Sequence, residues 1–484
     1  MSEGARPGGG EEAPVPQHLC LVLPSTGEFD SRTYRIATSC LARGHRVTVL
    51  ARWQAGLAER EEHPSGYTIV RVRASSVDGL PFPALRARAG ALLRRRHRSP
   101  GRQPTEPGDA APLPSRPAGD APAGPLSQAP NQAPASAPGP DPAPASTLRR
   151  ASPPRRAFAS LVRRLAIPLT IRSHARNALA VAPAADLYHG MAYMGIPVAL
   201  ALGRRHRAPV VYDARDIYLE ARNLAKMGGP ARWLLARYER GWAHRAARVL
   251  TVNEAYAEVM ADRFRTEKPL VVMNCSLRFD PPDPPERRFN VALGLDPAVP
   301  IVLYHGGLFP ERGIEQLVEA IGQIPGAALV LMGYGALEPT LRSLAAAPER
   351  ADRIHVLPAV PPQDLHGWVA AADVVAMPIQ PSTLNHRLTT PNKLFEAMAA
   401  GVPVVASDLP GMASIVREVG FGRLCDPADP RSIAREIRAV LEAPPRERAV
   451  MRANAREAAR TRYNWELQAG ILLREYGLHT DRRW

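Results

Sequence analysis

The sequence predicts an α/β protein with two doubly wound, Rossmann-like domains that face each other across a cleft. Short apolar runs alternate with helix-forming segments along most of the chain, which predicts parallel sheets with helices on both faces. A Pro-rich linker at 281–285 divides these repeats into two series. With 484 residues, 45 % of them hydrophobic, the chain is long enough for two complete cores.

The first domain, expected over residues 17–285, opens with a strand at 18–23, a loop at 25–30, a helix at 32–43 and a strand at 46–50. The loop follows the carboxyl end of the first strand, where doubly wound sheets bind ligands. Gly27 would let the backbone approach a phosphate or an acceptor there, and we include it among the donor-binding candidates. A plain turn glycine is the alternative.

Two segments lack the apolar residues that a core requires. Residues 1–16 are rich in Gly, Glu and Pro, which predicts a disordered tail rather than a signal peptide. Between 99 and 154 the large apolar residues are Leu113, Leu126 and Leu148. Because such a stretch cannot offset its ordering entropy, we expect a disordered insert within the first domain.

Four further apolar runs, at 185–189, 209–213, 248–253 and 270–274, predict more parallel strands of the first domain. Each run ends in a polar residue, which would place His189, Asp213, Asn253 and Asn274 along one rim of the cleft. His189 is therefore the candidate catalytic group on the acceptor side. A core histidine with satisfied hydrogen bonds is the alternative.

The second domain, expected over 286–462, begins with strand 301–304 and the loop 305–313, which leads into helix 314–324. In this loop Gly306 and Gly307 would allow backbone contact with phosphate oxygens, and the guanidinium of Arg312 would bind them as a fork. Strand 328–332 then leads to Gly333 and Gly335, which we expect on the base and phosphate side of the cleft. Strands at 354–357 and 373–377 follow. A solvated loop arginine is the alternative for Arg312.

Residues 389–407 join a polar loop to a helix and a strand. Pro391 suits a first helical turn, residues 393–400 form helices well, and Gly401 with Pro403 ends the helix before strand 404–406. The helix N-terminus favours a phosphate or a sugar hydroxyl. The donor-binding candidates in this segment are Thr389, Thr390, Pro391, Asn392, Lys393 and Glu396. An ordinary helix with surface Lys393 and Glu396 is the alternative.

The segment from Glu396 to Ala406 resembles the signature of retaining family-4 glycosyltransferases, enzymes of GT-B architecture. The resemblance implies transfer of a hexosyl group from a nucleotide-sugar, with no cofactor besides that co-substrate. It assigns Glu396 to the ribose hydroxyls and Arg312, aided by Lys393, to the leaving diphosphate. Leu388 stands where the family usually has an acid for the donor sugar, and Gly307 replaces a basic residue of its phosphate loop. Arg215 stands where many relatives have a histidine.

The resemblance also implies that residues 463–484 form a closing helix that packs back toward the first domain; a terminal helix on the second domain is the alternative. The implied product is a surface polysaccharide or a glycolipid. Two other functions stay open. A nucleotide-sugar epimerase would use the same donor, and a non-catalytic nucleotide-sugar-binding partner subunit would agree with Leu388 and Gly307.

Charge and cysteine content bear on partners and location. The net charge is +16, but the sequence has no zinc finger, RNA-recognition aromatics or dimerising heptads, so we expect no nucleic-acid partner. Basic amphipathic stretches at 85–98 and 155–176 would suit docking on an anionic membrane near a glycan or lipid-linked acceptor; a solvated basic face is the alternative. Four scattered cysteines have no metal-binding spacing and predict a reduced, cytoplasmic setting. The sequence has no Asp-x-Asp at a strand end near the expected diphosphate, which predicts a metal-independent reaction. With the basic stretches, the expected location is the inner face of the plasma membrane, where the protein would be peripheral.

Overall fold

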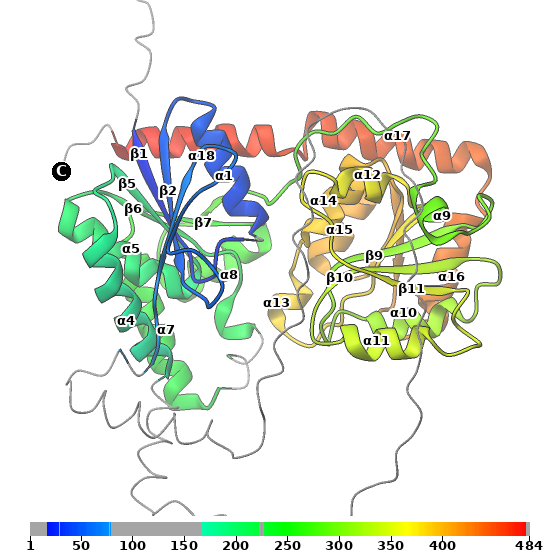
Figure 1. The fold of residues 1–484 in the computed structure, drawn as a ribbon, viewed down its shortest axis with the longest axis horizontal. Coiled ribbons are helices and arrows are strands. Elements are labelled where there is room, and N and C mark those ends of the chain that lie inside the picture. The colour runs from blue at the N-terminus through cyan, green and yellow to red at the C-terminus, as the bar shows by residue number, and fades with distance from the viewer. Residues whose placement is uncertain are drawn as a thin grey trace, which may run out of the picture.

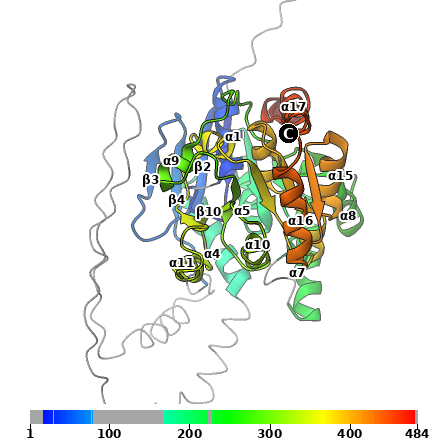
Figure 2. The ribbon, with the colours of Figure 1, turned by 90° about the vertical axis from the view of Figure 1, so that its right-hand side faces the viewer.

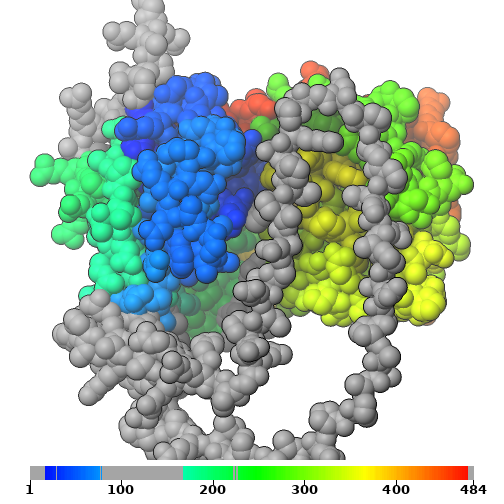
Figure 3. Space-filling model, viewed as in Figure 1, coloured from blue at the N-terminus to red at the C-terminus, as the bar shows by residue number. Residues whose placement is uncertain are grey.

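A computed structural model describes residues 17–28, 30–76, 78, 166–221, 224 and 227–480. Two α/β domains lie side by side, each built on a largely parallel sheet (Figures 1 and 3). This confirms the predicted fold class. The predicted tail at 1–16, the predicted insert at 99–154 and the basic stretch at 85–98 lie outside the described residues, as does the basic stretch at 155–176 up to residue 165.

The first sheet has the strand order β3-β4-β2-β1-β5-β6-β7-β8, with β3 antiparallel to β4 and the other pairs parallel. Its strands are β1 (His18–Val22), β2 (Arg46–Arg52), β3 (Arg60–Glu62), β4 (Thr68–Val72), β5 (Leu187–Met191), β6 (Val210–Asp213), β7 (Arg248–Thr251) and β8 (Leu270–Val271). Its helices are α1 (Ser31–Leu41), α4 (Ala166–Val181), α5 (Ala192–His206), η1 (Tyr218–Glu220), α7 (Gly229–Ala243) and α8 (Glu254–Phe264).

Alternate residues of these strands pack on opposite faces because side chains alternate along a strand. Leu19 and Leu21 of β1 join the core under α1, whereas Cys20 and Val22 join the core under α4, α5, α7 and α8. Both faces are thus buried, as a doubly wound sheet requires.

The second sheet is wholly parallel, with the order β11-β10-β9-β12-β13-β14. Its strands are β9 (Ile301–Gly307), β10 (Ala328–Tyr334), β11 (Ile354–Leu357), β12 (Val374–Met377), β13 (Val404–Ser407) and β14 (Gly422–Cys425). Its helices are α9 (Arg288–Leu293), α10 (Ile314–Ile321), α11 (Glu338–Ala345), α12 (Leu365–Ala370), α13 (Leu384–Arg387), α14 (Asn392–Ala399), α15 (Pro410–Val419), α16 (Pro430–Leu441) and α17 (Pro445–Thr461).

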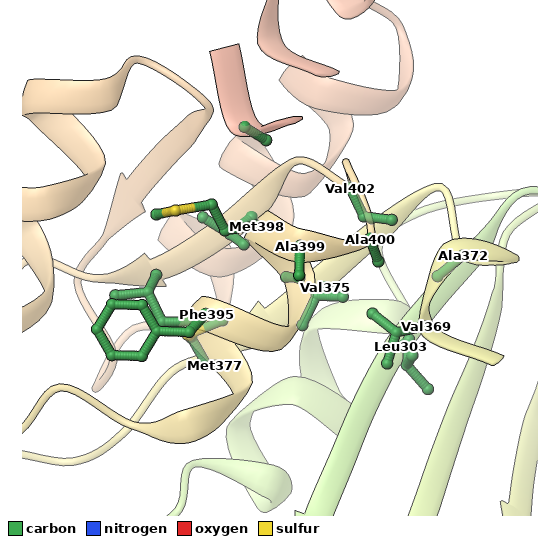
Figure 4. Packing of buried hydrophobic residues seen from close by; sticks show 14 of the residues in the cluster. Leu303, Val369, Ala372, Val375, Met377, Phe395, Met398, Ala399, Ala400 and Val402 are labelled. Atoms are coloured by element: carbon green, nitrogen blue, oxygen red, sulfur yellow. The ribbon is translucent and has the colours of Figure 1, made fainter. Parts of the chain in front are cut away.

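The same alternation organises the second core. Val302 and Tyr304 face α10 and α16, which lie side by side in Figure 2. Leu303 faces the opposite side, where α14 packs through Phe395 and Met398 (Figure 4). The buried face of α14 holds the helix on the sheet, and its N-terminal end projects toward the first domain.

The last helix, α18 (Trp465–Thr480), belongs to the core of the first domain. Figure 1 shows α17 and α18 running along the top of both domains in turn. Trp465, Leu472 and Tyr476 are buried against α1 and the first sheet, and the Trp465 indole N–H donates to Ser39 Oγ at 2.9 Å. In the described part of the chain, the path therefore crosses between the domains twice.

Several elements differ from the sequence prediction. Strands β3 and β4 were not expected, and neither was β14, which contains Gly422 and Arg423 and pairs along one edge with β13. The predicted strand at 185–189 lies two residues later, as β5, and the strand at 270–274 shrinks to Leu270–Val271. No helix in the described part of the chain is long and apolar enough to span a membrane.

Candidate active site

Glu396 is anchored by a histidine at the end of the first strand of the second domain. It lies on α14, and His305 Nε2 donates to Glu396 Oε2 at 2.9 Å. Both side chains are nearly buried. Burial alone would raise the pKa of Glu396, but the His305 hydrogen bond and the charges of His305 and Arg35 lower it below its usual range. Glu396 is thus an oriented carboxylate that accepts hydrogen bonds.

His305 was not among the residues predicted to form the site. Its partner lies 91 residues away, so no local pattern reports the pair. A polar residue that continues an apolar strand, after Tyr304, was the available signal.

Lys393 lies near this carboxylate, and Arg312 lies near Lys393. The Lys393 ammonium sits 3.6 Å from the ring centroid of Tyr304. Burial and the nearby positive charge of Arg312 lower the pKa of Lys393 to about 7, although Glu396 opposes the shift. Within the described residues neither Lys393 nor Arg312 forms an ion pair. Two such cations close together favour an anionic ligand between them.

The four predicted glycines of this region differ in what a side chain at each position would contact. Gly306 has φ of +102°, and a Cβ there would lie 4.0 Å from Lys393 Cε, so its backbone faces the cation pair. A Cβ on Gly307 would meet the Phe309 ring at 2.9 Å. Gly333 and Gly335 allow β10 to approach β9: added Cβ atoms would lie 1.9 Å from Gly306 O and 2.2 Å from Leu308 O. The close approach of these backbones therefore requires glycine at 333 and 335.

The loop before α14 is bound to the first domain. Asn253 Nδ2 donates to Leu388 O at 2.9 Å and to Thr390 Oγ1 at 3.2 Å. Asn274 donates to Asn392, which in turn donates to Ser31 Oγ at 3.3 Å. Thr389 is half-buried between these contacts, and Pro391 precedes the first turn of α14 as its N-cap.

These contacts revise the expectation for the strand-end residues. Asn253 and Asn274 do lie at the interdomain rim, but in this structure their amides bind the second domain. Asn385, on α13, adds to the same seam, since its Oδ1 accepts from Ile217 N at 2.8 Å and its Nδ2 donates to Asp216 Oδ1 at 3.0 Å.

His189 does not end its strand at the rim, and that expectation is wrong. β5 continues to Met191, and the His189 side chain is completely buried beneath α18. Tyr476 OH donates to Nδ1 at 2.7 Å, and Nε2 donates to Asp213 Oδ2 at 3.2 Å. Burial lowers the pKa of His189, although Asp213 opposes this, so a neutral ring with its proton on Nε2 satisfies both partners. His189 cannot contact a ligand in the cleft and acts instead by positioning Asp213.

Asp213 is likewise buried rather than exposed at the rim. Arg32 binds it through two nitrogens, at 2.7 and 3.1 Å, and also donates to Val272 O at 2.9 Å. Although burial opposes it, the charge of Arg32 and the His189 hydrogen bond lower the pKa of Asp213 well below its usual range. Arg32 fixes the start of α1 against the sheet, and with it the adjoining pocket wall.

A pocket of about 380 Å³ lies between the domains. Its floor includes Arg215, which donates to both oxygens of Asp30 at 2.9 Å. Of the predicted site residues, Gly27 and Asn392 line it. Gly27 has φ of +89°, a conformation that favours glycine. The lining residues are Ser25, Thr26, Gly27, Asp30, Ser31, Arg32, Arg215, Asn274, Tyr334 and Asn392.

The structure therefore brings six of the predicted site residues into two neighbouring groups. Gly306, Arg312, Lys393 and Glu396 surround the N-terminal half of α14, while Gly27 and Asn392 line the interdomain pocket. Leu388, in the position of the family's acid, packs against the first-domain core. Among the described residues, no group of three or more His, Cys, Asp or Glu side chains could hold a metal ion.

Both domains match family models. Residues 118–275 match the glycosyl transferase 4-like domain, and residues 286–458 match glycosyl transferases group 1. The D-inositol 3-phosphate glycosyltransferase of Xylanimonas cellulosilytica is 34 % identical over 214 residues, which are 42 % of this chain and 49 % of that relative. A GDP-mannose-dependent alpha-(1-6)-phosphatidylinositol monomannoside mannosyltransferase of Mycobacterium tuberculosis is 35 % identical over 202 residues, 40 % of this chain and 51 % of the relative. The chain spans about half the length of these two curated relatives.

Solved structures share the fold over nearly the whole chain. Sucrose-phosphate synthase from Thermosynechococcus elongatus has a TM-score of 0.63 at 18 % identity. The match covers 96 % of this chain and 98 % of the synthase chain. Anabaena HepE, solved with UDP and glucose, has a TM-score of 0.58 at 16 % identity. The match covers 95 % of this chain and 99 % of the HepE chain. With both domain models matched in order and the two-domain fold shared, the chain belongs to the GT-B glycosyltransferases of the family-4 type.

Proposed function

We propose that this protein is a retaining glycosyltransferase that moves a hexosyl group from a nucleotide-sugar to a glycan or lipid-linked acceptor. The observation that carries the proposal is the carboxylate of Glu396, held by His305, near the Lys393 ammonium and the adjoining Arg312. Neither cation has a carboxylate partner among the residues that the structure describes. A nucleotide-sugar has the complementary groups: ribose hydroxyls to donate to a carboxylate, and a diphosphate for the cations.

The relatives support the choice of substrates. HepE was solved with UDP-glucose, and curated relatives are named for transfer to inositol 3-phosphate or a phosphatidylinositol mannoside. We therefore assign the product to glycolipid or surface polysaccharide synthesis. We place the protein in the cytoplasm, peripheral to the inner face of the plasma membrane. Its four cysteines are free and buried, which suits a reducing compartment.

In the proposed reaction, the bond between the anomeric carbon and the diphosphate oxygen breaks. The acceptor hydroxyl oxygen bonds to that carbon on the same face, and its proton passes to the leaving phosphate oxygen. Arg312 and Lys393 stabilise the negative charge that develops on the diphosphate, with the N-terminal N–H groups of α14. We propose that these groups make a metal ion unnecessary.

The first test is thermal stabilisation by UDP, GDP, dTDP and ADP. A nucleotide at a hundred times its dissociation constant adds about 2.7 kcal/mol of stability. We expect one of the four to stabilise the protein, and we expect Glu396→Ala to abolish the effect because the ribose loses its acceptor. Arg417→Ala, on the exposed surface of α15, should respond like the unchanged protein. No stabilisation by any of the four would contradict the proposal.

The chemistry has separate tests. Transfer should persist in excess EDTA, and the NMR coupling of the product's anomeric proton should show the configuration of the donor. Activity that EDTA abolishes would disprove the metal-free reaction while leaving nucleotide binding intact.

Leu388 favours a second candidate, a non-catalytic nucleotide-sugar-binding partner subunit. It packs against the first-domain core where the family's acid would contact the donor sugar. Such a subunit would bind the nucleotide but release none from any nucleotide-sugar in the presence of membrane extracts. Nucleotide release that Arg312→Ala abolishes would exclude it.

A further inference from the structure

One face of α7 carries exposed aromatic, aliphatic and basic side chains. The helix lies at the lower end of the first domain in Figures 1 and 2, away from α17. The exposed fractions are 66 % for Trp233, 46 % for Leu234 and 53 % for Tyr238. With the exposed Arg237 they form a stripe, because residues three and four apart share a helix face. The exposed His244 and Arg245 follow directly after the end of α7 and extend the stripe. We call these six residues the α7 face.

The opposite side of α7 is firmly attached to the domain. Trp242 is buried in the core, and Tyr212 OH donates to Glu239 at 2.8 Å. Arg240 Nε donates to Arg263 O at 3.1 Å. The orientation of α7 is therefore set by buried contacts, which leave the α7 face turned outward.

The α7 face combines apolar and aromatic side chains with positively charged ones. Glu239 is the acidic residue of α7, and it is buried on the other side. Arg237 forms no ion pair with any residue that the structure describes. A groove of about 390 Å³ runs along the helix here, lined by Leu234, Arg237, Tyr238, Arg240, Gly241, His244 and Arg245.

We propose that the α7 face docks on an anionic lipid bilayer. Tryptophan and tyrosine are enriched at membrane–water interfaces, where their rings meet both apolar and polar surroundings. Arginines beside them would attract anionic headgroups. The charge disfavours other occupants, because the basic stretch at 85–98 or the same face of a second copy would bring like charges together.

The location suits a lipid-linked acceptor, and this part of the inference rests on the proposed function. Arg215 lines the interdomain pocket, and a short connection from it leads through η1 to α7. Glu220 at the end of η1 binds both Arg232 of α7 and Arg263 of α8. Asp216 and Ile217 bind Asn385 of the second domain. The docking helix is thus joined to the cleft by one hydrogen-bonded segment.

The test is sedimentation of the full chain with vesicles of phosphatidylcholine containing 30 % phosphatidylglycerol at 0.15 M salt, beside pure phosphatidylcholine. We expect binding to the anionic vesicles and a loss of at least tenfold in the partition coefficient for Trp233→Ala/Leu234→Ala/Tyr238→Ala. Val291→Ala/Val450→Ala, which removes exposed apolar side chains of the second domain, should bind like the unchanged protein.

A second pair of variants tests the contribution of positive charge to vesicle binding. Arg237→Glu/Arg245→Glu should lose binding, whereas Arg204→Glu/Arg205→Glu, at exposed sites on α5 with the same change in net charge, should retain most of it. Brominated lipid should quench tryptophan emission of the unchanged protein, and Trp233→Phe should remove most of that quenching.

Equal partitioning of the triple variant and the unchanged protein would overturn the proposal, as would failure of the unchanged protein to bind. Concentration-dependent dimers in ultracentrifugation, lost in the triple variant, would show a self-association surface instead. Nucleotide-induced thermal stabilisation of each variant verifies its fold. It also separates failure of docking from failure of the proposed function, because the α7 variants should keep the nucleotide response.

Discussion

At the scale of single residues, the buried pair of Arg32 and Asp213 links the pocket wall to the core. Arg32 is 1 % exposed and Asp213 is not exposed at all. A buried carboxylate is tolerated only while its charge is compensated. His189 and Tyr476 complete the network, which therefore depends on α18 from the far end of the chain.

We expect Arg32→Met to lower the free energy of unfolding of this domain by about 3–5 kcal/mol, because it leaves Asp213 buried without its cation. Urea denaturation followed by tryptophan emission measures the change. Arg417→Met, which breaks an exposed pair with Asp408, should cost less than about 1 kcal/mol. Adding Asp213→Asn to Arg32→Met should recover part of the loss, and no recovery would argue against an uncompensated charge as the cause.

Lys393 should make nucleotide binding depend on pH. Burial and Arg312 lower its pKa to about 7, below an unfolded value of 10.5. Lys393 is therefore increasingly neutral above pH 7. A bound diphosphate would stabilise the charged form of Lys393, so Lys393 would take up a proton when the nucleotide binds. We expect affinity for the stabilising nucleotide to fall by up to about tenfold per pH unit above 7.

Isothermal titration calorimetry in buffers of different ionisation enthalpy measures that proton uptake. Lys393→Met should remove the slope between pH 8 and 9.5, and the exposed Lys268→Met should keep it. An unchanged slope in Lys393→Met would assign the titration to another group.

At the scale of elements, α15 packs tightly on the loop that precedes α14. A Cβ on Gly411 would lie 2.4 Å from the carbonyl oxygens of both Leu388 and Thr389. The start of α15 therefore supports the same loop that Asn253 holds from the other domain.

We expect Gly411→Ala to cost about 1–3 kcal/mol, because backbone atoms must move to admit the methyl group. It should also weaken nucleotide binding, since the loop leads directly into α14. Gly241→Ala is the control: nothing lies within 4 Å of its Cβ position, and alanine in that helix should stabilise by about 0.5–1 kcal/mol. Urea denaturation and nucleotide titration of both variants test this, and unchanged nucleotide affinity in Gly411→Ala would contradict the supporting role.

At the scale of the whole molecule, the two domains meet through hydrogen bonds around α13. Tyr256 OH donates to the backbone oxygen of Asn385 at 2.8 Å, and the Asn385 side chain bonds to Asp216 and Ile217. Leu384 and Leu388 pack against the first-domain core. Opening the cleft would break these contacts together.

We expect Asn385→Ala to favour opening by about 1–3 kcal/mol, because the Ile217 N–H loses its buried acceptor. Hydrogen exchange should then speed up around residues 214–218 and 384–390 while the strands of both sheets keep their protection. Asn454→Ala, whose amide bonds to Gly420 within the second domain, should leave the seam unchanged. Equal exchange at the seam in both variants would refute this role of Asn385.

The local sequence pattern predicted most of the strands, because a buried strand is a run of consecutive apolar residues. Strand β4 was not predicted, although residues 68–72 form such a run. β14 carries no such run, since two of its four residues are Gly422 and Arg423. It is a strand because the edge of β13 offers unpaired backbone groups, which is a tertiary cause.

Strand periodicity, helix stops and the motif after Glu396 are local features, so the sequence predicts the two doubly wound sheets, the family and the importance of the loop and helix around Glu396. The use of Glu396 and His189 depends instead on contacts that form only in the folded protein. Glu396 gains its orientation from His305, 91 residues away, and His189 loses access to the cleft because Tyr476, 287 residues away, lies over it. Burial and hydrogen-bond partners depend on what the folded chain brings together, and spacing along the sequence does not carry that information.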